Sequence, residues 1–556
     1  MLTADQYEQL SSDMVNVYST GDSDSLGRMN AHFRRSFTVD DFRATVWRQI
    51  YKVRRAKGAA SAFGIPEAQE IISRHEGFPN WPSLIEAAST GKASTLPLYA
   101  LDLTKHRIAP RRAIQPHDWE TLAEVMREHS ITGFNSSGFI DDDGLRTISK
   151  LKHVTDLRLG GSRELTDEGL QCLANMPQLE YLELNEYPGG KLTDRCLEVL
   201  RHLPNLKKFE MTWQKGISDE GAANLRFCER LESVILMGTP TGDGAIAALS
   251  GKEHLQQLET GRLVTDAGLA RLREIPGLVK AKPGKEVKLL IDGPFTDQGF
   301  KELGALEAVC DLDLFWYVTG ITSDAFRILS EMPKLSVLGC DGDLCNDESL
   351  KHIARIPQLQ KLRAQNANAS DEGFISLSAS KTLMGFWGRE APNLTGRGFL
   401  AFSRMPSLQR LGISLAQVDD AALASLPDFP SLRELTPIDV RDHGFRHIAK
   451  CSKLERLTCM YCRDTTDIAT AHIEPLQIKY YYAGLTQITD RSLEILGRMD
   501  SLEQIEFYET KEITDRGVSY LTRLPNLKEI HFGGIPNVTY EGSNIFPSNV
   551  MVRYNV

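Results

Sequence analysis

The sequence predicts an α/β solenoid of stacked strand–helix repeats, with a small all-α domain in front of it. Three observations support this fold class. A motif of the form hydrophobic–Thr–Asp–x–Gly–Leu recurs along most of the chain, and residues 165–170 are a clear copy. Leucines with the spacing L-x-x-L-x-L follow many copies, and residues 1–92 do not carry the repeat. Self-similarity at a fixed period is typical of solenoids, in which each unit buries its leucines against its neighbours.

The motif occurs seventeen times between residues 140 and 538. The mean spacing of about 25 residues lies within the range of roughly 20–29 that is typical of one class of solenoid repeat. The copies begin at Ile140, Leu165, Leu192, Ile217, Pro240, Val264, Phe295, Ile321, Cys345, Ala369, Leu394, Val418, Val440, Thr465, Ile488, Ile513 and Val538. One gap is longer, 31 residues from Val264 to Phe295. We expect its extra segment, 278–290, to form a bulge, an added loop or a break in curvature.

Each repeat contains the signals for one short helix and one strand. Thr or Ser stands where a helix N-cap belongs, with Asp beside it, as at Thr166 and Asp167. A proline such as Pro177 then ends the helix. The strand that follows has alternating residues, so one set of side chains points into the core and the other points outward. Several repeats have lost a core leucine, notably at Ala364, Gly388 and Pro437.

The repeat resembles the leucine-rich-repeat family over roughly residues 114–556. Its form is similar to the cysteine-containing subclass found in F-box-associated receptors and in many bacterial proteins. The resemblance implies a parallel sheet on the concave face, helices on the convex face and a role in binding other macromolecules. Residues 68–81 resemble a short helical module that often precedes repeats in bacterial proteins. That second resemblance favours a bacterial source and implies no activity.

We therefore expect three regions. They are a helical N-terminal domain over 1–92, a linker and transition over 93–118, and a solenoid of about 17 repeats with terminal caps over 119–556. In the first region the spacing of apolar residues predicts helices over 5–19, 38–57 and 66–75. Residues 119–134 read as the helix and strand of an atypical first repeat, and 546–556 as a last strand that covers the open edge.

Composition narrows the function. The formal net charge is -10 and the isoelectric point is about 5.8, which argues against binding nucleic acid or an anionic membrane through bulk charge. No apolar stretch approaches the ~18 residues that a membrane span needs, and no signal peptide is recognisable. The nine cysteines are irregularly spaced, which suits a reducing compartment. We expect a cytoplasmic protein without membrane or nucleic-acid partners.

No motif for catalysis or for a cofactor stands out. Cys459 and Cys462 form a C-x-x-C, but both fall on core positions of the repeat, and no second ligand pair completes a zinc site. His443 and His447 are four residues apart on an expected helix and lack an identifiable third ligand. We therefore predict no enzyme, no metal and no cofactor.

The outward positions of the strands are the best candidates for a binding site. They gather basic and aromatic residues, the types that dominate binding hot spots. The predicted partner-binding residues are Lys361, Arg363, Trp387, Arg389, Arg410, Phe315, Tyr481 and Tyr508. Two interpretations of this patch stay open. Either it binds a partner, or Trp387 packs sideways against neighbouring strands while the arginines pair with nearby acids.

The expected function is a non-enzymatic scaffold that binds a protein or peptide on the concave repeat surface. One alternative is a substrate receptor of a ubiquitin-ligase-like complex, although residues 1–92 lack a recognisable F-box pattern. A second is an enzyme with its activity in the N-terminal domain or in 278–290. A third is nucleic-acid binding through the basic stretch 43–57, which predicts a steep dependence on salt.

Overall fold

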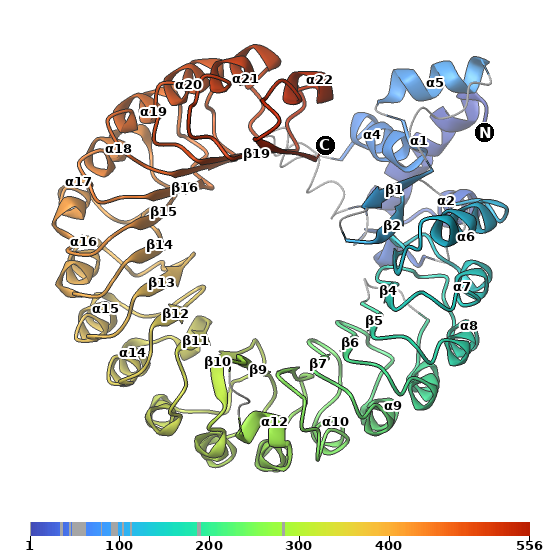
Figure 1. Cartoon of the computed structure of the whole chain (residues 1–556), viewed down its shortest axis with the longest axis horizontal. Helices are drawn as coiled ribbons and strands as arrows, with labels where there is room; N and C mark the ends of the chain where they lie inside the picture. Colours follow the sequence, from blue (N-terminus) through green and yellow to red (C-terminus); the bar gives the residue numbers. More distant parts are fainter. Residues whose placement is uncertain are drawn as a thin grey trace. The chain divides into compact units, whose positions relative to one another are not determined.

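The computed structural model describes residues 2–33, 37–43, 46, 63–78, 80–90, 98–102, 105–111, 114–185, 191–280 and 284–555. The described residues form two compact units, one up to Val309 and one from Cys310 onward. Each unit alternates strands with short helices, in the manner expected of a solenoid (Figure 1). Among the described residues, no helix is both long enough and apolar enough to cross a membrane.

The first unit begins with a module of helices that we call the front module. Its helices are α1 (Ala4–Thr20), α2 (Ser23–Phe33), α4 (Ile65–His75) and α5 (Trp81–Thr90). The expected helices over 5–19 and 66–75 are confirmed, whereas α2 and α5 were not predicted. Most of the helix expected over 38–57 lies outside the described residues. Helix α1 begins at Thr3, which forms a capping box with Gln6, and ends at Gly21, whose φ of 75° suits glycine.

The front module has its own core and also packs on the first repeats. Tyr7, Met14 and Ile72 are buried among its helices. The His75 and Phe139 rings are tilted against each other with 5.8 Å between their centroids, and the Arg163 guanidinium lies 4.5 Å from the centre of the Phe37 ring. Both contacts join the module to the start of the repeat array within the first unit. The module therefore covers apolar surface that the first repeats would otherwise expose.

A hairpin opens the sheet of the first unit. Strands β1 (Tyr99–Asp102) and β2 (Arg107–Pro110) pair antiparallel, and β2 pairs in parallel with β3 (Gly133–Asn135). Residues 99–110 fall in the segment expected to be a linker and transition, and in the structure they extend the sheet. Helix α6 (Asp118–Glu128) and β3 confirm the atypical first repeat expected over 119–134.

The remaining elements of the first unit follow the repeat. Its parallel strands are β4 (Asp156–Arg158), β5 (Tyr181–Glu183), β6 (Lys208–Glu210), β7 (Ser233–Ile235), β8 (Gln257–Glu259) and β9 (Val287–Ile291). Its helices are α7 (Asp142–Ile148), α8 (Asp167–Leu170), α9 (Asp219–Ala222), α10 (Asp243–Ala247), α11 (Asp266–Arg271), α12 (Pro276–Val279) and α13 (Asp297–Phe300). Short 3₁₀ segments are η1 (Gln171–Asn175), η2 (Asp194–His202), η3 (Ala223–Phe227), η4 (Leu272–Glu274) and η5 (Lys301–Ala305).

The long repeat keeps its strand pairing. The helical turn α12 precedes β9, and β9 still pairs in register with β8, with Leu258 opposite Leu289. Residues 281–283 lie outside the described residues, so the expectation of a bulge, an added loop or a break in curvature at 278–290 stays a prediction.

The second unit repeats the same pattern. Its strands are β10 (Val309–Leu314), β11 (Val337–Cys340), β12 (Lys361–Arg363), β13 (Gly385–Gly388), β14 (Arg410–Ser414), β15 (Glu434–Ile438), β16 (Arg456–Met460), β17 (Tyr480–Gly484), β18 (Gln504–Tyr508), β19 (Glu529–Gly533) and β20 (Met551–Asn555). Its α-helices are α14 (Asp347–Ile353), α15 (Asp371–Leu377), α16 (Gly396–Ala401), α17 (Asp420–Leu423), α18 (Asp442–Ile448), α19 (Asp467–Ile473), α20 (Asp490–Leu496), α21 (Asp515–Leu521) and α22 (Tyr540–Ser543). Its 3₁₀ segments are η6 (Ser323–Glu331), η7 (Gly342–Leu344), η8 (Phe402–Arg404) and η9 (Leu426–Asp428).

In the second unit the strands lie on the inner side and the helices on the outer side (Figure 1). We call these sides the strand face and the helix face. Strand β20 pairs in parallel with β19, which confirms the expected last strand. Counted over the described residues of both units, β3 to β19 supply one strand for each of the seventeen repeats. The described residues therefore form an α/β solenoid of stacked strand–helix repeats.

Rows of apolar side chains run across the strands and form the core. Parallel pairing places Leu362, Phe386, Leu411 and Leu435 opposite one another, and each is at most 3% exposed. The positions that lack a leucine are also buried. At Gly388, an added Cβ would lie 2.6 Å from a ring atom of Phe386, so that ring fills the space of the missing side chain.

The Thr–Asp–x–Gly motif has a second role that its sequence did not reveal. The threonine caps its own helix, while the aspartate accepts hydrogen bonds from the threonine of the next repeat. Asp490, for example, accepts from the Thr514 backbone N–H at 2.8 Å and from the Thr514 hydroxyl at 2.7 Å. The glycine makes room for this contact, because a Cβ at Gly517 would lie 2.2 Å from Asp490 Oδ1. We call this series of contacts the aspartate ladder.

The aspartate ladder joins most consecutive repeats within each unit. The same double contact links Asp142–Thr166, Asp167–Thr193, Asp194–Ser218, Asp243–Thr265, Asp266–Thr296, Asp347–Ser370, Asp371–Thr395, Asp442–Thr466, Asp467–Thr489, Asp490–Thr514 and Asp515–Thr539. The double contact is not made, for example, where Gly396 replaces the aspartate, where Gly242 replaces the threonine that would face Asp219, and where Asp420 pairs with Arg446 and His447. Capping and repeat-to-repeat bonding thus account for the motif's carboxylates.

Candidate functional site

Three neighbouring strands of the second unit carry a basic and aromatic surface on the strand face. In register, Lys361 of β12 lies opposite Gly385 of β13, which lies opposite Arg410 of β14. Trp387 follows on β13, and Arg389 comes directly after that strand. We call Lys361, Trp387, Arg389 and Arg410 the β12–β14 patch.

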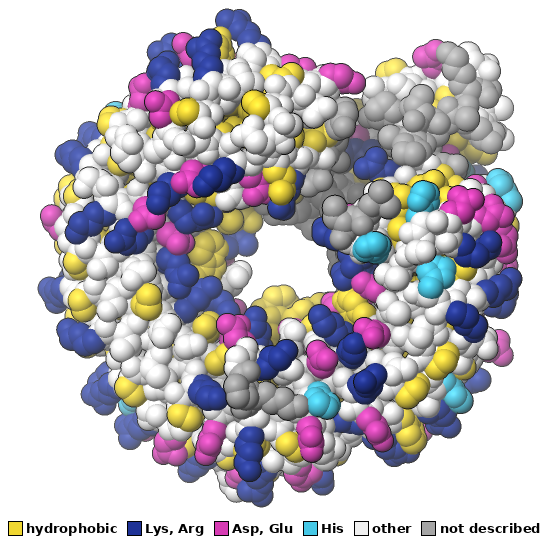
Figure 2. Space-filling view, in the orientation of Figure 1, with side chains coloured by type: hydrophobic (Ala, Val, Ile, Leu, Met, Phe, Trp, Pro, Cys, Tyr) yellow, Lys and Arg dark blue, Asp and Glu magenta, His cyan; other side chains and the backbone are white. Residues whose placement is uncertain are grey.

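Two cations of this patch share the space above a glycine. A Cβ at Gly385 would lie 3.4 Å from Arg410 Nε and 3.6 Å from Lys361 Cγ, so both side chains extend over this residue. Partial burial lowers the pKa of Lys361, and the nearby charges of Arg363 and Arg410 lower it further. No carboxylate of the described residues lies within ion-pair distance of Lys361 or Arg410. Basic side chains are visible over this part of the strand face in Figure 2.

Trp387 packs sideways across the sheet. It lies opposite Gly412 of β14, where an added Cβ would come within 2.2 Å of the indole Cε3. The interpretation that Trp387 packs against neighbouring strands is therefore right, yet the ring is only half-buried. Its orientation is fixed before any partner arrives, which lowers the entropy cost of binding.

Arg389 is partly ordered by an aromatic ring. Its guanidinium lies 4.4 Å from the centre of the Tyr461 ring, and its side chain remains 34% exposed. The carboxylate of Glu390 lies at 3.9 Å, at the outer limit of an ion pair. Such an exposed pair contributes little free energy, so the charge of Arg389 is available to a partner.

Arg363 is paired with acidic side chains of the same face, so its charge is not available to a partner. Its Nε donates to Asp313 Oδ1 at 3.2 Å and its Nη2 donates to Asp313 Oδ2 at 2.6 Å, while Asp311 forms a second ion pair with the same group. Asp313 reaches Arg363 across β11 because Gly339 stands between them without a side chain. For this arginine, the interpretation that it pairs with nearby acids is right.

Phe315 and Tyr508 are surface residues that lie on other repeats of the second unit. Phe315 stacks on Trp316 with 4.9 Å between ring centroids, and Trp316 is 62% exposed. Tyr508 of β18 covers Gly533 of β19 and is 36% exposed. The structure therefore does not bring these two aromatic residues into the β12–β14 patch, and their role in binding stays a prediction.

The prediction for Tyr481 was wrong. This side chain is 1% exposed and lies in the buried row between Leu457 and Ile505. In the repeat spacing, Ile478 takes the first apolar position, which places Tyr481 three residues later in the core. The outward residues of β17 are instead Tyr480 and Tyr482. The register set by Ile478 was the sequence signal that could have found them.

Further contacts on the strand face join neighbouring repeats, so the sequence of one repeat does not reveal them. The Arg456 guanidinium lies 3.7 Å from the centre of the Tyr480 ring, and the Tyr480 hydroxyl donates to Glu506 at 3.2 Å. Gly385 and Gly412 give the patch its shape, although a glycine has no signal as a binding residue. Their importance follows only from which side chains lie opposite them.

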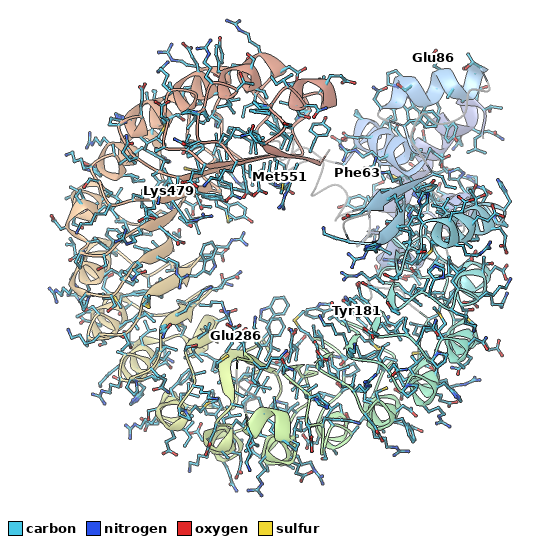
Figure 3. All side chains as sticks on the ribbon, in the orientation of Figure 1. Phe63, Glu86, Tyr181, Glu286, Lys479 and Met551 are labelled. Carbon is cyan, nitrogen blue, oxygen red and sulfur yellow. The ribbon has the colours of Figure 1, made fainter. Side chains whose placement is uncertain are left out.

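The strand face of the first unit is more fully paired. Tyr181, which projects from β5 (Figure 3), donates to Glu210 at 2.7 Å, while the Arg158 guanidinium lies 4.7 Å from its ring centre. Arg158 also pairs with Asp156, and Glu210 accepts from Asn185 at 2.6 Å. These polar groups bind one another, in contrast to Lys361 and Arg410.

The cysteines and histidines that the sequence singled out do not form a metal site or a redox site among the described residues. Among the described residues, no cluster of three or more His, Cys, Asp or Glu side chains could hold a metal ion. His447 is buried and contacts Asp420 at 2.9 Å. Cys459 and Cys462 are both buried, and burial raises the pKa of Cys462 to about 12. A thiol with a raised pKa is a poor nucleophile, so this C-x-x-C lacks the usual features of a redox pair.

The reactivity of the thiols towards a reagent in solution tests whether the cysteines are buried as the structure shows. Seven cysteines are buried, while Cys172 and Cys310 are of intermediate exposure. We expect a chromogenic disulfide reagent at mildly alkaline pH to modify at most these two in the folded protein, and all nine in denaturant. Mass mapping identifies the sites. Fast modification of Cys459 or Cys462 in the folded protein would contradict the structural interpretation of the C-x-x-C.

No family model and no curated protein matches the chain. Solved structures do match. A complex of Rad7 and Elc1 in yeast aligns with 16% identity and a TM-score of 0.32, covering 79% of this chain and 88% of the other. A complex of TLR13 with ssRNA13 aligns with 14% identity and a TM-score of 0.44, covering 80% and 72%. At these values neither likeness carries information about the partners of this chain.

Proposed function

We propose that the chain is a non-enzymatic interaction scaffold that binds an acidic segment of a protein or peptide on the β12–β14 patch. The observation that supports this is the placement of Lys361 and Arg410 together above Gly385, without an acidic partner among the described residues. Two cations held close together repel each other, so an anionic group between them relieves the repulsion.

The chemistry of the patch defines the segment that it would accept. A carboxylate of the partner binds between Lys361 and Arg410, where both cations donate hydrogen bonds to it. An apolar or aromatic residue one or two positions away packs on the half-buried indole of Trp387. Buried aromatic and arginine side chains contribute most of the affinity at many interfaces, whereas electrostatic complementarity sets partner choice and association rate.

Selection from a random-peptide phage library tests this proposal. We expect the wild-type chain to enrich peptides that carry Asp or Glu next to a large apolar residue. The double variant Lys361→Glu/Arg410→Glu should bind these peptides about a hundredfold more weakly, because two attractive contacts become repulsive. Isothermal titration calorimetry at two salt concentrations measures the affinity, which should fall as salt rises.

A matched variant controls for net charge. Lys351→Glu/Arg404→Glu makes the same change on exposed residues of α14 and η8, away from the strand face, and should leave peptide affinity within about twofold of wild type. Trp387→Ala/Arg389→Glu should weaken binding as well. Enrichment of peptides without acidic residues, or equal loss of affinity in both charge-reversal variants, would show that the patch is not the binding site. The ubiquitin-ligase alternative stays a prediction.

A further inference from the structure

The outward positions of β10 and β11 differ in charge from those of β12–β14. Three of them hold carboxylates and none holds a lysine or an arginine. In the paired part of each strand and at the residue directly after it, they are Asp311, Asp313 and Phe315 on β10, and Val337, Gly339 and Asp341 on β11. Arg363 reaches back from β12 and neutralises part of this charge. Within the second unit the strand face therefore changes from acidic to basic between β11 and β12.

An aromatic turn follows β10 directly. The Val318 N–H donates to the Phe315 carbonyl at 3.2 Å, which closes a turn with Trp316 and Tyr317 at its corners. The rings of Phe315 and Trp316 stack with 4.9 Å between their centroids. Trp316 is 62% exposed and Tyr317 is 41% exposed, so both offer apolar area to a partner. We call Phe315, Trp316, Tyr317 and Asp341 the β10–β11 patch.

Asp341 brings an accessible acceptor to this patch. Leu314 of β10 lies opposite Cys340 of β11, so the residues that follow them, Phe315 and Asp341, stand side by side, with about 5 Å between the two chains. Asp341 Oδ1 accepts from the Gln365 N–H at 2.9 Å. Its Oδ2 accepts no hydrogen bond from the described residues and is not a fully buried atom. A ligand can therefore reach this oxygen and donate to it.

The surroundings of Asp341 favour a cation as that ligand. Burial raises the pKa of Asp341 and the charge of Asp313 raises it further, whereas the Gln365 N–H lowers it. A cation placed at Oδ2 would stabilise the ionised carboxylate against this repulsion. The rings beside it favour the same ligand, because a lysine or arginine head group is attracted to a ring face and its carbon stem covers apolar surface.

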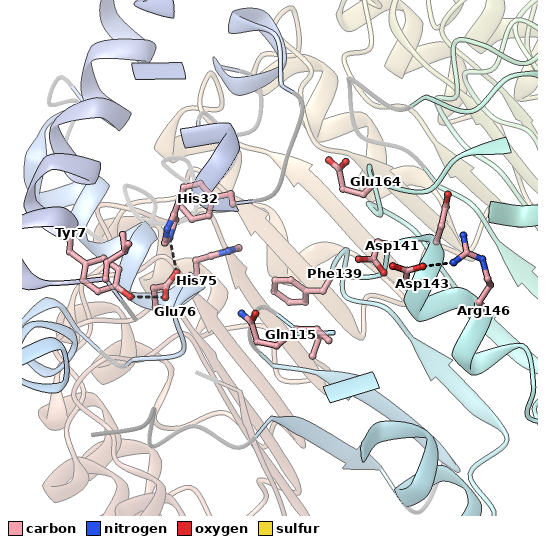
Figure 4. Close-up of a pocket in the computed structure, with 14 residues that line it drawn as sticks. Tyr7, His32, His75, Glu76, Gln115, Phe139, Asp141, Asp143, Arg146 and Glu164 are labelled. Carbon is pink, nitrogen blue, oxygen red and sulfur yellow. Dashed lines mark hydrogen bonds and ion pairs between the residues drawn. The ribbon is translucent and has the colours of Figure 1, made fainter. Parts of the chain in front are cut away.

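The cavity between the front module and the first repeats is lined by acids of another kind. Its volume is about 660 Å³. Glu76 accepts from the Tyr7 hydroxyl at 2.8 Å and contacts His32 Nε2 at 2.9 Å, and Asp143 pairs with Arg146 (Figure 4). These acids bind neighbours within the first unit, whereas the β10–β11 patch keeps one carboxylate oxygen for a ligand.

We infer that the segment bound by the β12–β14 patch also carries an arginine or lysine, whose head group binds Asp341 Oδ2 and whose stem packs on Trp316. This inference rests on the proposed function, because it names a second residue of the same segment. The ligand is then a peptide with both charges, and its basic residue meets the acidic part of the strand face.

The register of the strands sets the spacing between the two charged residues of that peptide. Gly385, above which Lys361 and Arg410 meet, lies level with Val337, which is two strands away and four residues before Asp341. With ~4.8 Å between strands and ~3.3 Å per residue, the two contact points are about 16 Å apart. An extended peptide spans roughly 3.3–3.6 Å per residue, so its acidic and basic residues should be about five positions apart.

Selection from the random-peptide phage library tests this inference on the full chain. The wild type should enrich peptides that carry Arg or Lys about five positions from Asp or Glu. The double variant Trp316→Ala/Asp341→Asn should still enrich the acidic residue but not the basic one. Because Trp316 is exposed and Asn keeps an acceptor for the Gln365 N–H, both changes leave the fold intact.

A double-mutant cycle with the most enriched peptide locates the contact. Asp341→Asn should weaken binding about tenfold by calorimetry, and less than about twofold once the basic residue of the peptide is replaced by methionine. Glu331→Gln, which removes an exposed charge at the end of η6, should leave the affinity within about twofold of wild type.

Two results would overturn the inference while the proposed function stands. One is enrichment of acidic peptides that have no basic residue near this spacing. The other is an equal loss of affinity in Asp341→Asn for the original and the methionine-substituted peptide. If the wild type enriched no acidic residue at all, the proposed function would fail and the inference with it.

Discussion

Replacing Arg363 with methionine is expected to lower the local stability of β10–β12 by about 2–3 kcal/mol. The substitution keeps most of the apolar stem but leaves Asp311 and Asp313 facing each other without their cation. Burial already raises the pKa of Asp313, and the charge of Asp311 raises it further, whereas Arg363 opposes both effects. The estimate lies below the usual cost of breaking a fully buried pair, because these groups are partly exposed.

Hydrogen–deuterium exchange with mass spectrometry measures this effect where it occurs. A repeat array can open locally, so a single melting temperature does not isolate one contact. Peptides that cover β10 and β12 should exchange faster in Arg363→Met, and the additional changes Asp311→Asn and Asp313→Asn should restore at least half of the lost stability. Arg389→Met is the matched control, since it loses one cation–π contact worth less than about 1 kcal/mol. Equal effects of the two arginine variants would contradict the structural role of Arg363.

The sequence was sufficient to predict the fold because the fold is periodic. The sequence of each repeat contains the signals for its own helix cap, helix and strand, and the many copies make the pattern unambiguous. The front module does not repeat, so its helices had to be inferred from single segments. Helix α2, with few buried residues, was missed for that reason. The hairpin of β1 and β2 was missed as well, since it belongs to neither the module nor the repeat.

The candidate site was less predictable because its properties depend on several repeats at once. Whether an arginine is free or paired is decided by acids two strands away. Arg363 is neutralised by Asp311 and Asp313, about fifty residues earlier, across a glycine that bears no side chain. Lys361 and Arg410 also stand at outward strand positions, but each of them lies next to the other cation above Gly385 instead of next to an acid. Tyr481 shows a second reason why the prediction failed. An error of one residue in the strand register moves a side chain from the surface to the core.

Replacing Asp490 with alanine should lower the stability of the adjoining repeats by about 2–3 kcal/mol, because two charge-assisted hydrogen bonds to Thr514 are lost. The N–H and hydroxyl of Thr514 would then lack their acceptor at the junction between α20 and α21. Asp490→Asn keeps one acceptor oxygen and should cost less. Glu494→Ala, on the exposed side of the same helix, should have little effect. Urea unfolding combined with hydrogen exchange over 488–521 measures the difference.

The chain contains its own control for the aspartate ladder. Asp420 opens α17 as Asp490 opens α20, but it binds Arg446 and His447 and is 42% exposed. Asp420→Ala should therefore destabilise the protein much less than Asp490→Ala does, because an exposed ion pair contributes little. In the wild type, the repeats around α16 and α17 lack the ladder contact and should open more readily than those around α20. If Asp420→Ala and Asp490→Ala proved equally destabilising, the aspartate of the repeat would act only within its own helix, and the ladder would not hold neighbouring repeats together.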